Sequence, residues 1–85
     1  MKLDFSRRFL KELDRLPADL RRRVGKQLDI LCENPRHPSL QVKKMKGEGA
    51  FWEARVTQGY RIIFRWEGDT AYLEHVGPHD ILRKP

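Results

Sequence analysis

Three arginines at strand-like spacing form the part of the sequence best suited to chemistry. Arg61 and Arg65 lie four residues apart in an alternating segment, so both side chains are expected on one face of a strand, with Arg55 on the same face of the neighbouring strand. Guanidinium groups stay charged at any relevant pH and bind phosphate oxygens in a bidentate manner. The spacing therefore predicts an anion-binding face. Glu53 shares that face, which leaves open the alternative of cross-strand salt bridges alone.

A histidine follows this arginine-rich segment. His79 comes directly after Gly77-Pro78, a dipeptide that predicts a turn. An imidazole beside an arginine face can accept or donate a proton near neutral pH, and the alternative is an exposed turn residue. His75 is expected to be packed or hydrogen-bonded within a strand. Because one histidine lies in a strand and the other in a turn, they are not placed as a metal pair, and no metal site is predicted.

A cluster of lysines precedes Gly47. Lys43, Lys44 and Lys46 belong to residues 41–46, which can form a short strand. These lysines are candidates for contacts with a nucleic-acid backbone, and a solvated strand edge is the alternative.

Positive charge is concentrated in the first half of the chain. Eighteen Lys and Arg against twelve Asp and Glu give a net charge of +6, and residues 1–46 hold 13 of the basic and 6 of the acidic side chains. Such a field attracts polyanions, and it would equally suit an acidic protein partner.

The first half of the sequence has a helical period. Ser6 can cap a helix that Pro17 ends, Phe5 is placed to pack on its first turn, and a second helix runs from Pro17 to Asn34-Pro35. The apolar positions recur every three or four residues: Phe9, Leu10, Leu13 and Leu16, then Leu20, Val24, Leu28 and Leu31. This pattern predicts two amphipathic helices in a hairpin, followed by a loop at 36–39.

The second half changes to a period of two. Residues 51–56 and 60–66 alternate and are joined by a short turn, and residues 71–76 are expected to form a third strand whose inward face the pattern leaves open. The aromatic side chains of the first two strands share the core-facing parity, which favours packing over base stacking: Trp52, Tyr60, Phe64 and Trp66. The sequence therefore predicts an α+β fold, with an N-terminal helical hairpin on a small antiparallel sheet of three to four strands.

The length of 85 residues predicts a single domain spanning residues 1–85. No apolar run reaches the roughly 18 residues of a membrane span, and the N-terminus does not have the pattern of a signal peptide. The single cysteine, Cys32, excludes an intrachain disulfide and fits a reducing compartment. We therefore expect a cytoplasmic protein that does not contact membranes.

Six motifs follow one another along nearly the whole chain: Leu16-Pro17, Glu33-Asn34-Pro35, Lys43–Gly47, Trp52–Val56, Gly59–Phe64 and His75–Asp80. In this order and spacing, the motifs resemble the RelE/ParE superfamily. The resemblance implies the toxin of a type II toxin–antitoxin system, held by a cognate antitoxin in a hetero-oligomer. The RelE-like branch, which His79 together with Arg61 favours, cleaves mRNA in the ribosomal A site without a metal or other cofactor.

The resemblance also implies roles for individual residues. In RelE-like cleavage the RNA 2′-OH attacks the adjacent phosphorus, giving a cyclic phosphate and a free 5′-OH. Arg61 would stabilise the charged transition state. His79 would act as general acid or base, Glu53 is the other candidate base, and Arg55 matches a strand position that supplies a charged group. The residues that would bind RNA are Lys43, Lys44, Lys46 and Arg65.

Two other functions remain open at this point. A ParE-like toxin would inhibit DNA gyrase without nuclease activity. A non-toxic module of the same fold would retain only antitoxin binding.

Overall fold

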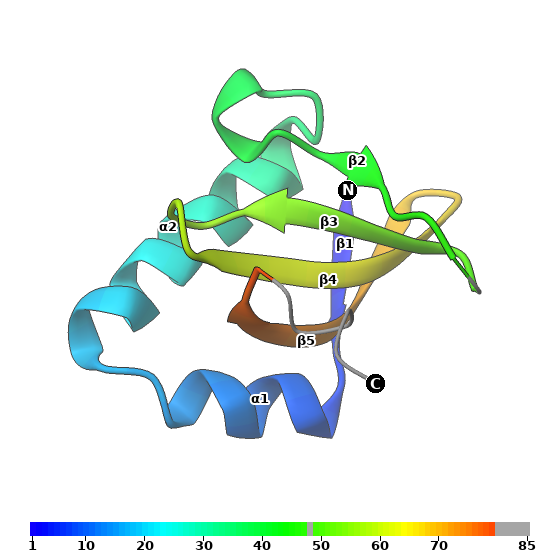
Figure 1. Ribbon diagram of the computed structural model, residues 1–85. Coiled ribbons are helices and arrows are strands. Elements are labelled where there is room, and N and C mark those ends of the chain that lie inside the picture. The colour runs from blue at the N-terminus through cyan, green and yellow to red at the C-terminus, as the bar shows by residue number, and fades with distance from the viewer. Residues whose placement is uncertain (48, 80–85) are drawn as a thin grey trace.

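The computed structural model describes residues 1–47 and 49–79, in which two helices pack on a five-stranded mixed sheet (Figure 1). The elements in chain order are β1 (Lys2–Phe5), α1 (Arg7–Asp14), α2 (Ala18–Glu33), the 3-10 turn η1 (Pro38–Leu40), β2 (Lys43–Lys44), β3 (Phe51–Arg55), β4 (Tyr60–Glu67) and β5 (Thr70–Pro78). The strand order across the sheet is β1-β5-β4-β3-β2. The α+β class is confirmed.

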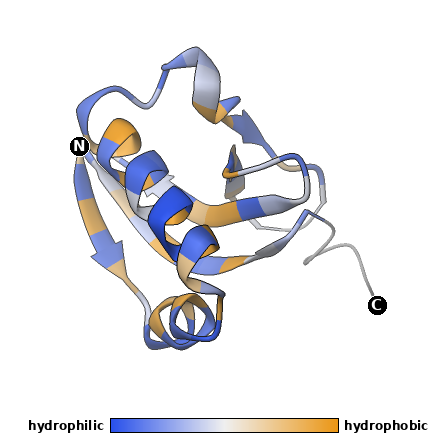
Figure 2. Cartoon of the chain, turned by 90° about the vertical axis from the view of Figure 1, so that its left-hand side faces the viewer, coloured by the Kyte–Doolittle hydropathy of each residue, from blue (hydrophilic) through white to orange (hydrophobic). Residues whose placement is uncertain are grey.

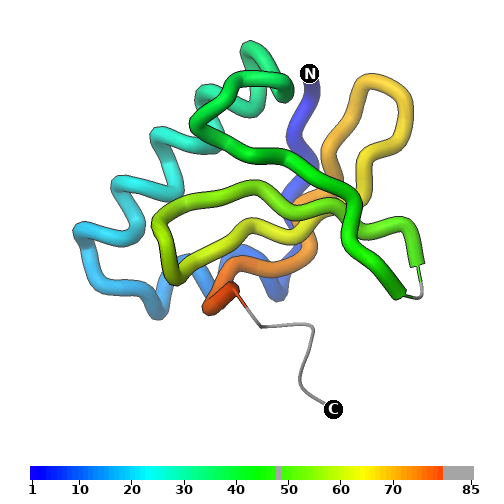
Figure 3. Tube along the Cα trace, turned by 45° about the horizontal axis from the view of Figure 1, so that its top comes forward, coloured from blue at the N-terminus to red at the C-terminus, as the bar shows by residue number. Residues whose placement is uncertain are grey.

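The prediction of three to four antiparallel strands was wrong in one respect, because β1 adds an edge strand that runs parallel to β5. Leu3 pairs with Ala71, and the Lys2 N–H donates to the Asp69 carbonyl at 2.8 Å. Figure 3 shows this N-terminal segment, in blue, running beside the orange β5. Four residues are too few to show a clear alternating pattern in the sequence. β1 forms because its backbone pairs with β5, which is distant in sequence.

The last strand is longer than its hydrophobic pattern indicated. β5 runs through Gly77 to Pro78, which pairs with Tyr60, so the predicted turn begins at His79 instead. A bulge at Ile63/Phe64 changes the pairing register between β4 and β5. Asp80, the end of the sixth motif, lies outside the described residues.

The segment before β2 is also different from the prediction. The loop expected at 36–39 contains η1, and the strand expected at 41–46 is only Lys43–Lys44. Leu40, the last residue of η1, is fully buried, and Gln41 after it has a φ of 45°, in the left-handed region. This conformation interrupts the extended backbone, so the strand begins two residues later.

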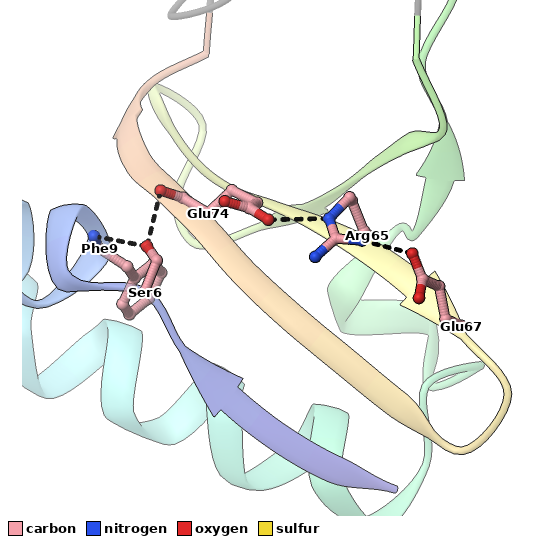
Figure 4. A network of polar contacts seen from close by, with 5 residues as sticks. All are labelled: Ser6, Phe9, Arg65, Glu67 and Glu74. Carbon is pink, nitrogen blue, oxygen red and sulfur yellow. Dashed lines mark hydrogen bonds and ion pairs between the residues drawn. The ribbon is translucent and has the colours of Figure 1, made fainter.

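Helix α1 begins as the sequence predicts. The Ser6 hydroxyl accepts from the Phe9 N–H at 3.0 Å, and the rings of Phe5 and Phe9 lie 5.7 Å apart. The same hydroxyl donates to the Glu74 carbonyl at 3.2 Å (Figure 4). The Ser6 N–H donates to the Leu73 carbonyl at 3.0 Å. Ser6 therefore fixes the start of α1 onto β5.

Replacing Ser6 by alanine is expected to lower the free energy of unfolding by about 1–2 kcal/mol, since the cap and the bond to Glu74 are both lost. Urea denaturation measures the change. Ser39→Ala is the matched control, because the Ser39 side chain is exposed and makes no hydrogen bond within the described residues. Equal effects of the two substitutions would contradict the capping role.

Helix α2 presents its apolar stripe to the sheet and its charged residues to solvent, and Figure 2 shows the hydrophilic and hydrophobic bands around it. Val24, Leu28 and Leu31 are buried as predicted. Gln27 is buried beside them, and its Nε2 donates to the carbonyls of Arg55 at 2.8 Å and Ser39 at 3.3 Å. One amide therefore joins α2, η1 and β3.

The core lies between the helices and the sheet. Its largest fully buried side chains include Phe9, Leu31, Ile62, Phe64 and Leu73. Among the described residues, no helix is long and apolar enough to cross a membrane.

Candidate functional site

The charged strand residues gather on the side of the sheet away from the helices, here called the open face. Arg55 pairs with Arg61 and Glu53 pairs with Ile63, and directly paired residues share a face. The alternation along β3 and β4 therefore places Glu53, Arg55, Arg61, Ile63 and Arg65 on the open face, as the sequence predicts.

Two arginines and a histidine lie at one end of the open face. Arg55 and Arg61 are direct cross-strand partners, and on the other side of Arg61 lies Gly77, which has no side chain to fill the space. The His79 N–H donates to the Gly59 carbonyl at 2.9 Å, which holds His79 beside the turn between β3 and β4. The His79 side chain is exposed. We call Arg55, Arg61 and His79 the turn-end cluster.

Arg61 is anchored by the turn that it borders. Its Nη1 donates to the carbonyl oxygens of Thr57, Gln58 and Tyr60 at 2.6, 3.1 and 3.0 Å. These bonds use one terminal nitrogen, so Nε and Nη2 are left to bind an anion. A guanidinium fixed by backbone carbonyls keeps its position before any ligand arrives, which is the preorganisation that electrostatic stabilisation requires.

Arg55 is positioned by a residue that the sequence did not single out. Its Nη1 donates to Oε1 of Gln41 at 3.3 Å, and Gln41 lies just after η1. Within residues 1–47 and 49–79, neither Arg55 nor Arg61 forms an ion pair with a carboxylate. Two adjacent like charges without a carboxylate favour an anion between them.

Glu53 pairs with a lysine rather than with an arginine. Lys43 lies opposite it on β2, and the Lys43 Nζ is 3.4 Å from Glu53 Oε1. Glu53 is only 4% exposed, its partner Ile63 is fully buried, and Oε2 has no hydrogen-bond partner within the described residues. The middle of the open face is therefore a small buried patch, with its charged groups around the margin.

Arg65 lies at the other end of the open face, about 13 Å from Arg61 along the strand. Its Nε donates to Glu74 Oε2 at 2.9 Å and its Nη1 contacts Glu67 (Figure 4). Its guanidinium lies 4.7 Å from the centre of the Tyr72 ring. The hydrogen bond that Arg65 donates to Glu74 raises the pKa of Arg65 above its ordinary value. For Arg65 the structure shows the salt-bridge alternative, so its cation is already neutralised.

The remaining predicted residues are not brought together in one patch. Lys44 pairs with Trp52 on the opposite side of β2 from Lys43, and Lys46 is exposed beyond the end of the strand. His75 is part-buried against α1, with Nδ1 3.5 Å from Glu12 Oε2, as expected of a packed strand residue. In the part of the chain that the structure describes, no group of three or more His, Cys, Asp or Glu could hold a metal ion.

Comparisons with known proteins agree on one family. The family model described as "ParE toxin of type II toxin-antitoxin system, parDE" matches residues 3–82. Toxin RelE3 of Methanocaldococcus jannaschii is 33% identical over 79 residues, which span 89% of this chain and 88% of that protein.

Two solved toxin–antitoxin complexes contain similar chains. The archaeal RelE–RelB complex from Pyrococcus horikoshii OT3 is 26% identical, with a TM-score of 0.72 over 91% of this chain and 92% of that chain. The intact E. coli RelBE toxin–antitoxin complex is 26% identical, with a TM-score of 0.71 over 91% of this chain and 94% of that chain. The resemblance read from the six sequence motifs is therefore confirmed.

Proposed function

The chain belongs to the ParE toxin family of type II toxin–antitoxin systems, and on that premise we propose that it is a ribosome-dependent, metal-independent mRNA endoribonuclease. The observation that carries the proposal is the turn-end cluster. It combines two cations that lack carboxylate partners among the described residues with one exposed imidazole. The similarity to a protein named as a RelE toxin supports RNA as the substrate.

The proposed reaction uses a nucleophile within the RNA itself. The 2′-OH attacks the adjacent phosphorus, the bond to the 5′-oxygen breaks, and the products are a cyclic phosphate and a free 5′-OH. One group must take the proton from the 2′-OH, another must give a proton to the leaving oxygen, and cations must stabilise the phosphorane.

The roles follow from exposure and position. Arg61, with Nε and Nη2 available, stabilises the phosphorane, and Arg55 beside it binds the same phosphate. His79 moves a proton, because its side chain is exposed at the same end of the face. Glu53, the other candidate base, is buried and faces Lys43, so we assign it the positioning of that lysine. Lys43 and Lys46 contact the RNA backbone.

We further propose that the chain binds a cognate antitoxin, as its structural relatives do in their complexes. A groove of about 670 Å³ between α2 and η1 offers a surface for it. Arg23 and Lys26 contribute cations there, and Ile30 and Val56 contribute apolar surface. This combination suits an acidic amphipathic segment.

The nuclease proposal is tested with purified protein, mRNA-programmed ribosomes and primer extension. We expect cuts within the A-site codon, lost in His79→Ala and in His79→Gln, since neither substitute transfers a proton near neutral pH. The fold is expected to survive both changes, because the side chain is exposed. Lys2→Ala, on β1 at the far edge of the sheet, is the control and should cut normally. Intact mRNA with a protein that stops growth would overturn the proposal.

The name of the matching family favours one alternative. A ParE-like toxin would inhibit supercoiling by purified DNA gyrase and leave mRNA intact, with His79→Ala as active as the native chain. A non-toxic antitoxin-binding module would cause no growth defect when overexpressed.

A further inference from the structure

A second candidate binding site lies on the side of the sheet opposite the turn-end cluster. It is an open groove of about 580 Å³ between the segment around η1 and the strands β3 and β4. Its lining is rich in aromatic and proline side chains and includes Pro35, Arg36, Pro38, Gln41, Trp52 and Trp66. We call it the tryptophan groove.

The two tryptophans leave aromatic surface available for stacking. Trp52 and Trp66 share the core-facing parity with Phe64, but Phe64 is fully buried and both indoles are partly exposed. Their ring centres are 5.1 Å apart in an edge-to-face arrangement. In this arrangement one ring presents its edge to a face of the other, and the Trp66 ring also lies 6.3 Å from the Phe64 ring. Part of each tryptophan side chain therefore stays exposed outside the core.

Cations border this aromatic surface. Arg36 lines the groove beside His37. Lys44 is the direct partner of Trp52, and since Lys43 faces Glu53 on the open face, the alternation along β2 directs Lys44 to the groove side. Within the described parts of the chain, neither Arg36 nor Lys44 has a carboxylate partner.

The wall of the groove is held in place before any ligand binds. The His37 Nδ1 accepts from the Ser39 N–H at 3.1 Å and so caps η1, whose Leu40 is fully buried. Gln41 then turns the chain with its left-handed backbone, a conformation that persists only where the surroundings impose it.

We propose that the tryptophan groove binds an unpaired nucleotide of single-stranded RNA. The base stacks on the exposed indole surface, and the phosphate contacts Arg36 and Lys44. Aromatic faces next to unpaired cations are the pattern by which single strands are bound without regard to sequence, whereas an acidic helix would leave the indoles unused. The inference rests on the proposed function, which supplies the RNA strand.

The short strand β2 connects the groove to the cleavage site. Lys43 lies on the open face and Lys44 on the groove side, so the two consecutive lysines put charge on both sides of the sheet edge. A strand whose phosphate is cleaved at the turn-end cluster would pass around β2 and place a flanking base on the tryptophans. The groove thus acts as a second anchor and does not contact the reacting phosphate.

The chain provides its own probe for this proposal. Trp52 and Trp66 are its only two tryptophans, so its tryptophan fluorescence comes from the groove. Titration of the His79→Ala chain with hexauridylate is expected to give saturable quenching that weakens as salt is raised. Arg36→Ala combined with Lys44→Ala should raise the Kd at least tenfold.

Matched controls separate the groove from general charge. Arg8→Ala combined with Lys11→Ala removes the same charge from α1, and we expect the Kd to stay within twofold. Uridine monophosphate should bind much more weakly than hexauridylate, since a single nucleotide cannot contact the tryptophan groove and the turn-end cluster at the same time.

Four outcomes would overturn the proposal. The first two are no quenching by hexauridylate and an equal loss of affinity in the two double variants. The other two are equal affinities for uridine monophosphate and hexauridylate, and quenching by the antitoxin but not by RNA. The titration does not depend on cleavage, so its result is separable from that of the proposed function. Quenching without A-site cuts would overturn the proposed nuclease activity and support RNA binding in the groove. Cuts without quenching would overturn RNA binding in the groove alone.

Discussion

Replacing Arg61 by alanine is expected to slow A-site cleavage by about 10²–10³-fold, the usual effect of losing one preorganised group that stabilises transition-state charge. The guanidinium is fixed by three backbone carbonyls and stands opposite Arg55. Single-turnover cleavage on programmed ribosomes measures the rate. Arg61→Lys should recover only part of it, because an ammonium group keeps the charge but not the planar, bidentate geometry.

Two controls accompany the Arg61 substitution. Thermal unfolding shows whether the turn between β3 and β4 survives the loss of its guanidinium. Arg22→Ala removes an equal charge from the exposed side of α2, where Arg22 pairs with Asp19 at 3.1 Å, and cleavage should remain within about twofold of the native rate. An equal loss in Arg22→Ala would show that total charge matters and the position of Arg61 does not.

Replacing Phe64 by alanine is expected to lower the free energy of unfolding by about 3–5 kcal/mol, because a large, fully buried ring leaves a cavity behind. The total free energy of unfolding of a small domain is only about 5–15 kcal/mol, so a substantial unfolded fraction of the Phe64→Ala chain is expected at physiological temperature. Urea denaturation followed by tryptophan fluorescence measures the loss.

Leu10→Ala is the matched control for Phe64→Ala. Leu10 is 49% exposed on α1, so its truncation should change the free energy of unfolding by less than about 0.5 kcal/mol. A similar loss from both substitutions would contradict the assignment of the core to the space between helices and sheet.

The elements that the sequence predicted best are those with a strong local signal. Ser6 caps α1 and Asn34-Pro35 ends α2 because capping and the restriction before proline act within a few residues. β3 and β4 follow from their alternation. The inward face of β5 could not be assigned, since the bulge beside Phe64 shifts the pairing register and Glu74 falls between the paired residues Leu73 and His75.

For the candidate site, the sequence predicted on which face of the sheet each side chain lies, but not which groups it contacts. Alternation placed Arg55, Arg61 and Arg65 on one face, yet only the structure shows Arg65 paired with Glu74, and Arg61 held by a turn. Partners of this kind depend on strand register and on which strands adjoin. Trp66 illustrates the same limit. The alternation along β4 predicted on which side of the sheet Trp66 lies, but not that its side chain lines a groove and stays partly exposed there.

The pairing of β1 with β5 sets when the toxin can fold during its own synthesis. The hydrogen bond from Ser6 to Glu74 spans 68 residues, so the first strand waits unpaired until nearly all of the described chain has been made. Contacts between such distant segments close late and slow the folding reaction. His79 follows β5, so the turn-end cluster also forms last. A nascent chain that has not reached β5 therefore lacks both the β1–β5 pairing and the complete turn-end cluster.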